Sequence, residues 1–67
     1  MGYYVIKKSK PKAGLSTIAL SEFYFVLKAS NGEVIATSEM YSSKQAAKNG
    51  IASVQSNGPS TDIRDEA

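Results

Sequence analysis

Four lysines near the N-terminus are the residues of this chain whose types and spacing best suit the binding of a ligand. They are Lys7, Lys8, Lys10 and Lys12. Residues 1–21 contain no acid and carry a charge of +4, whereas residues 22–67 hold four basic and six acidic residues and sum to −2. Clustered ammonium groups displace counterions from phosphates and bind polyanions, and Tyr3, Tyr4 and Tyr24 would supply ring faces for base stacking. The alternatives are a solvated basic loop and tyrosines that are half-buried in a sheet.

A second group of polar side chains, Ser42, Ser43 and Lys44, precedes an apolar stretch with a helical period. Backbone N–H groups at a helix start bind small anions, and a Ser/Lys pair is one way to build a nucleophile. The structural alternative is a capping box, because Ser42 and Gln45 have the spacing at which each side chain satisfies the other's backbone donor. Capping alone accounts for Ser42.

The remaining side chains argue against most kinds of catalytic centre. The chain has no Cys and no His, which excludes thiol nucleophiles, disulfides, imidazole bases and the commonest zinc ligands. The acids are scattered, with no spacing that pairs them as metal ligands or as acid and base: Glu22, Glu33, Glu39, Asp62, Asp65 and Glu66. Phosphate-binding glycine motifs are missing as well. We therefore expect a non-enzymatic chain with no cofactor, no metal and no catalytic residue.

Hydropathy predicts a cytoplasmic protein with no membrane partner. No stretch of the chain approaches the roughly 20 apolar residues of a membrane span. The N-terminus MGYYVIKK lacks the apolar core of a secretion signal.

Apolar periodicity predicts three strands in the first 40 residues. Residues 3–8 and 22–29 are aromatic and β-branched with alternating character, and residues 9–21 form a long, basic connection between them. In the second strand we assign one face to the core (Phe23, Phe25 and Leu27) and the other to the exterior (Tyr24, Val26 and Lys28). Asn31-Gly32 suits a two-residue type I′ turn, so residues 34–40 are expected to return antiparallel.

After Tyr41 the period changes to that of a helix. Its narrow apolar stripe comprises Ala46, Ala47, Gly50, Ile51 and Val54. A glycine in a helix interior costs about 1 kcal/mol relative to alanine, so we expect the backbone at Gly50 to pack too closely for a Cβ. The helix is expected to end at Asn57, with Gly58 in the left-handed conformation and Pro59 beyond it. The last ten residues could add one short strand.

The run from Phe23 to Val54 resembles the YegP-like family of small bacterial proteins of unknown function. The pieces that carry the resemblance are LKASNGEVIATSE across the hairpin, YSSK at the helix start and KNGI within the helix. Residues 9–21 depart from the family, where a shorter turn is usual. The resemblance implies an α+β domain over residues 1–67, with a three-stranded antiparallel meander, one helix and a short C-terminal strand. It also implies that the unit occurs either as a tandem repeat or as a single copy, as here, and that two copies build one sheet by exchanging C-terminal strands, with both helices on one face.

Size argues separately for a partner. A chain of 67 residues buries only about 60% of the surface that it exposes when unfolded, and small domains usually need a disulfide, a metal or a second subunit. A meander with one helix also leaves long sheet edges that favour pairing. We therefore expect a homodimer that serves as a binding module of unidentified partner. Two alternatives are weak nucleic-acid binding through the lysines and an enzyme acting on a small anion at the helix start.

Overall fold

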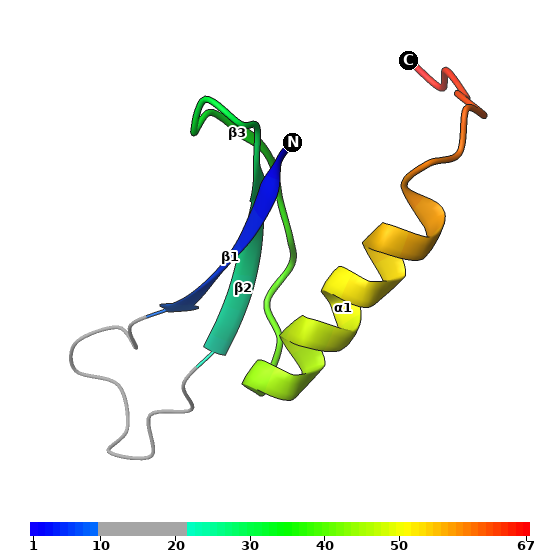
Figure 1. Cartoon of the computed structure of the whole chain (residues 1–67). Helices are drawn as coiled ribbons and strands as arrows, with labels where there is room; N and C mark the ends of the chain where they lie inside the picture. The colour runs from blue at the N-terminus through cyan, green and yellow to red at the C-terminus, as the bar shows by residue number, and fades with distance from the viewer. Residues whose placement is uncertain (10–21) are drawn as a thin grey trace.

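The computed structural model describes residues 1–9 and 22–67 and has an α+β architecture, with a helix on one face of a small antiparallel sheet (Figure 1). The elements follow the predicted order: β1 (Tyr3–Ser9), β2 (Glu22–Lys28), β3 (Val34–Thr37) and α1 (Lys44–Asn57). Most of the connection predicted for residues 9–21, with Lys10 and Lys12, lies outside the described residues.

The sheet is the predicted meander, in the order β1-β2-β3. β1 and β2 pair over their full length, from Tyr3 opposite Lys28 to Ser9 opposite Glu22. β3 pairs only with the second half of β2, where Leu27 faces Ala36 and the register shifts at Lys28. The sheet is therefore widest at the end that carries the β2-β3 hairpin.

The hairpin is confirmed, but its turn differs from the prediction. Ala29 N–H donates to Glu33 O at 2.8 Å and Gly32 N–H donates to Ala29 O at 2.8 Å, which makes a three-residue loop. Within this loop only Gly32 has a positive φ, of 88°, as in a type I turn that ends in a glycine bulge. The type I′ prediction was wrong because the Asn31 side chain accepts the Glu33 N–H at 3.0 Å, which stabilises Asn31 in a right-handed turn.

β3 ends earlier than the predicted residue 40, because the chain bulges away from β2 after Thr37. Ser38 N–H still donates to Phe25 O at 2.9 Å, and Ser38 Oγ replaces a backbone carbonyl by accepting the Phe25 N–H at 2.9 Å. Pairing resumes at Tyr41, which exchanges two backbone hydrogen bonds of 2.7 and 2.8 Å with Phe23. A side chain thus bridges the interruption, and Tyr41 is held at the sheet directly before α1.

Both helix ends depart from prediction by small shifts. The N-cap is Ser43, whose Oγ accepts the Ala46 N–H at 3.0 Å, so the capping box predicted from Ser42 is wrong by one residue. At the other end Gly58 has a right-handed φ of −58° and donates its N–H to Val54 O at 2.6 Å. The left-handed conformation predicted for Gly58 was therefore wrong, because this glycine continues the helical hydrogen bonding before Pro59.

The core is very small. Three hydrophobic side chains are buried among the described residues, namely Phe25, Val26 and Ala47. Phe25 lies under α1, stacked on Tyr41 at a centroid distance of 6.1 Å and edge-on to Tyr4 at 6.0 Å. Val26, predicted to face the exterior, is only 5% exposed, and it lies between Val5 and Thr37 in the sheet. Phe23 and Leu27, predicted in the core, are half-buried.

The predicted close approach at Gly50 is confirmed. A Cβ built on Gly50 would lie against Tyr41 Oη, 2.7 Å from Tyr41 Cζ and 3.1 Å from Phe25 Cε2. The first half of α1 therefore packs on the sheet through small residues, and Ala47 is fully buried. Beyond Ile51 every helix residue is exposed, as α1 slants away from the sheet toward its C-terminal end (Figure 1).

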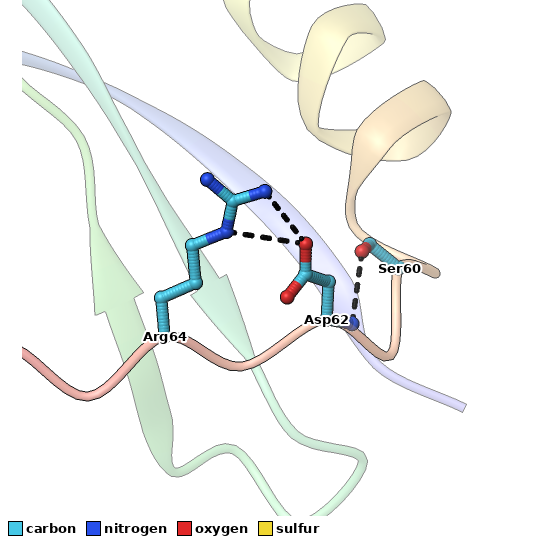
Figure 2. Close-up of polar contacts among 3 residues, drawn as sticks. All are labelled: Ser60, Asp62 and Arg64. Carbon is cyan, nitrogen blue, oxygen red and sulfur yellow. Dashed lines mark hydrogen bonds and ion pairs between the residues drawn. The ribbon is translucent and has the colours of Figure 1, made fainter.

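Residues 59–67, the C-terminal tail, adopt no strand in this single chain, so the predicted C-terminal strand is not confirmed. Every residue of the tail is exposed. Figure 2 shows its local contacts, in which Arg64 donates from Nε and Nη2 to Asp62 Oδ2 at 3.2 and 3.0 Å, and Asp62 N–H donates to Ser60 Oγ at 3.1 Å. Such exposed pairs contribute about 0–1 kcal/mol, so they do not fix the tail against the domain.

No helix among the described residues is both long enough and apolar enough to cross a membrane.

Candidate polyanion-binding face

The pairing register divides the side chains of β1 and β2 between two faces. Directly paired residues of an antiparallel sheet point to the same side, and successive residues alternate. The face under α1 carries Tyr4, Ile6, Lys8, Phe23, Phe25 and Leu27. The opposite face, called the open face below, carries Tyr3, Val5, Lys7, Tyr24, Val26 and Lys28. No described element covers the open face, because α1 lies on the other side of the sheet (Figure 1).

The open face contains two tyrosine–lysine pairs separated by a valine pair. Tyr3 lies opposite Lys28, and Lys7 lies opposite Tyr24. Such directly opposed residues have Cβ atoms about 4.5–5.5 Å apart. The two tyrosines therefore occupy one diagonal of the face and the two lysines the other, with the valine pair between them.

Exposure along the open face is graded. Tyr3 is 45% exposed and Lys7 is exposed, whereas Tyr24 and Lys28 are of intermediate exposure. The two tyrosines and two lysines are thus partly or fully accessible, whereas Val26 between them is nearly buried and Val5 is half-buried. This arrangement gives a flat surface that combines aromatic faces with positive charge.

The lysines of the open face are available to a ligand. Within residues 1–9 and 22–67 the structure contains one ion pair, between Asp62 and Arg64 in the tail. Glu22, the first residue of β2, is on the open face next to Tyr24 and lies opposite Ser9. Neither Lys7 nor Lys28 forms an ion pair with a described residue, and the Glu22 carboxylate is on the same face, beside the Lys7–Tyr24 pair.

The structure divides the predicted lysine group. Lys7 is on the open face with Tyr3 and Tyr24, but Lys8 is on the helix face opposite Phe23, as is the third predicted tyrosine, Tyr4, opposite Leu27. Lys10 and Lys12 lie outside the described residues. Lys28 was not predicted as a site residue. The period of β2 places it on the same face as Tyr24, but only the strand register puts it beside Tyr3.

The predicted anion site at the helix start consists of three exposed residues, Ser42, Ser43 and Lys44. The Ser43 hydroxyl is occupied as the N-cap by the Ala46 N–H. What the geometry provides here is a capped helix start, and anion binding or catalysis at these residues stays a prediction. Among the described residues no three acidic side chains come together in a way that could hold a metal ion.

Comparison with known proteins gives consistent matches across most of the chain. Residues 21–65 match the family model described as "Domain of unknown function (DUF1508)". The chain is 54% identical over 59 residues to UPF0339 protein YegP of Yersinia pestis, covering 88% of this chain and 45% of that protein. It is 60% identical over 45 residues to UPF0339 protein YegP of Escherichia coli strain K12, covering 67% of this chain and 41% of that protein.

A further relative is UPF0339 protein ACIAD0721 of Acinetobacter baylyi, which is 48% identical over 65 residues and is matched over 97% of this chain and 50% of its own length. The chain thus spans about half the length of the curated relatives it matches. No solved structure gave a match. The hairpin and helix that the sequence resemblance rested on lie within the matched residues 21–65, and the chain belongs to the YegP-like UPF0339 family, which shares this domain of unknown function.

Proposed function

We propose that this chain works as a homodimeric, non-enzymatic binding module. In this dimer the second copy covers the outer half of α1, takes up the C-terminal tail and so completes the sheet.

The observation that carries the proposal is the large solvent-accessible surface area of the single chain. The chain exposes 5561 Å² for a mass of 7.2 kDa, whereas a folded monomer of that mass exposes about 4,100 Å². The excess of about 1,400 Å² per chain is larger than the roughly 800 Å² that each partner buries in a standard interface. The Cα radius of gyration, 14.5 Å, likewise exceeds the roughly 11 Å of a compact domain of this length.

The uncovered apolar side chains lie where a second copy would bind. Val54 on the outer half of α1 is 36% exposed, Ile35 on β3 is 63% exposed and Ile63 in the tail is 91% exposed. Fully burying one such side chain is worth about 1.5–3 kcal/mol. Covering these three would therefore supply several kcal/mol that the single chain does not gain.

The sheet also has two free edges. In the order β1-β2-β3, each outer strand has one described neighbour, β2. Unpaired strand edges favour pairing with another chain, and an extended tail segment around Ile63 is long enough to add a strand. The family model extends through Asp65, so the tail is part of the shared domain. The curated relatives are about twice as long as their match to this chain, which leaves room for a second unit in one polypeptide.

Sedimentation equilibrium at micromolar concentration tests the dimer. We expect a mass twice the 7.2 kDa of one chain, and a solution that holds only the single-chain species would refute the proposal.

The tail variant Ile63→Asp tests the exchange, because a carboxylate in a buried apolar contact is strongly unfavourable. We expect it to shift the equilibrium to monomer. The matched control is Arg64→Ala, next to it in the tail, where the side chain is 79% exposed and the dimer should persist. A dimer that survives Ile63→Asp unchanged would show that the tail is not exchanged.

A further inference from the structure

The two tyrosine–lysine pairs of the open face point to a ligand class. We propose that the open face binds single-stranded nucleic acid, with Tyr3 and Tyr24 stacking on bases and Lys7 and Lys28 contacting phosphates. The proposal does not depend on the dimer, because β1 and β2 of one chain supply all four residues.

The spacing of the pairs suits a single strand. Four residue steps along a strand separate the two pairs, which is about 14 Å at the antiparallel rise of 3.4 Å per residue. Within each pair the tyrosine and lysine Cβ atoms are about 4.5–5.5 Å apart, so a base stacked on either tyrosine has a lysine nearby for its phosphate. A ligand strand running along β1 and β2 would meet one such pair, then the valine pair, and then the second pair.

The ring exposure separates this ligand from other polyanions. Ring stacking needs an unpaired base whose face is accessible, and every base has such a face, so stacking on a sheet is tolerant of sequence. A duplex or an acidic peptide would use the two lysines only. The tyrosines also lie on the face away from α1 and outside the small core built on Phe25 and Ala47, so α1 does not cover their rings.

The lysine on the other face supplies an internal control. Lys7 and Lys8 are adjacent, equally charged and both exposed, but Lys8 points to the helix side opposite Phe23. A non-specific charge effect would depend on both lysines alike. Binding on the open face depends on Lys7 and Lys28 alone.

Fluorescence anisotropy with a labelled oligo-dT measures the affinity at low salt, with a duplex of equal length as competitor. Tyr24→Leu and Tyr3→Leu keep an apolar side chain but remove the ring, and each is expected to weaken binding about 5- to 150-fold. Lys7→Gln and Lys28→Gln are each expected to reduce the slope of log affinity against log salt by about 0.7. Lys8→Gln should leave both the affinity and the salt slope within error of wild type.

Stacking has its own spectroscopic signature in this protein. The chain has no Trp and four Tyr, so its ultraviolet emission comes from tyrosine and should be quenched as oligo-dT binds. An anisotropy that does not rise with protein concentration at low salt, which means no binding of oligo-dT, would overturn the proposal. So would equal binding of duplex without quenching, equal losses for Lys7→Gln and Lys8→Gln, or unchanged affinity in both Tyr→Leu variants with native circular dichroism.

Discussion

Gly50→Ala gives the sharpest test of how α1 is held on the sheet. Judged by helix propensity alone, alanine in a helix interior is better than glycine by about 1 kcal/mol. The structure predicts the opposite sign, because the added methyl group would lie against Tyr41 Oη, 2.7 Å from Tyr41 Cζ and 3.1 Å from Phe25 Cε2. Contacts that short require the neighbouring atoms to move.

The Tyr41 ring has little freedom to move away. Its backbone exchanges two hydrogen bonds with Phe23, and its ring stacks on Phe25, which is 6% exposed. Overpacking of this kind costs typically 1–3 kcal/mol. Subtracting the gain in propensity leaves a net loss of up to about 2 kcal/mol, and each kcal/mol lowers the melting temperature of a domain of this size by about 4–8 °C.

Urea unfolding at fixed protein concentration measures the effect, since association would otherwise change the apparent stability. The matched control is Ala52→Gly, two residues further along the exposed part of α1, which should cost the plain propensity difference of about 1 kcal/mol. The double variant Tyr41→Leu with Gly50→Ala should recover part of the loss, because leucine has no atoms at the position of the ring's far end. If Gly50→Ala instead stabilises the protein by as much as Ala52→Gly destabilises it, the close-packing argument is wrong.

Three further substitutions test the side-chain hydrogen bonds at the start of α1 and at Phe25 in β2. Ser43→Ala removes the N-cap oxygen and should cost about 1 kcal/mol, whereas Ser42→Ala should change the free energy of unfolding by less than about 0.5 kcal/mol; a larger loss at Ser42 would restore the capping box that starts one residue earlier. Ser38→Ala leaves the partly buried Phe25 N–H without its acceptor and should cost about 1–3 kcal/mol. The amide of Phe25 should then exchange with deuterium faster, and unchanged exchange would mean that a water replaces the hydroxyl.

Local sequence signals determined much of this fold. Alternation in Glu22–Lys28 and the helical spacing from Ala46 to Val54 are set by the repeat of each element, so both were predicted within about one residue. Gly50 was also interpretable, because a glycine in an otherwise good helix indicates that something displaces a Cβ. The resemblance in the hairpin and helix was enough to place the chain in its family.

Features that depend on partners distant in the sequence were not predictable. The turn type at Asn31 depended on one side-chain hydrogen bond, and the early end of β3 depended on Ser38 reaching Phe25, 13 residues away. Val26 is buried and lies between Val5 and Thr37 in the sheet, although its strand period matches that of an exposed face.

The candidate site, like the fold, was predictable from the sequence only in part. Composition and charge identified lysines and tyrosines as the residues able to bind a polyanion, since residue chemistry is a property of the sequence. Only the register of β1 on β2 separated Lys7 from Lys8 and brought Lys28 beside Tyr3. A shift of one residue in that register would exchange the two faces, so the sequence supplies the functional groups and the strand pairing determines which of them share a surface.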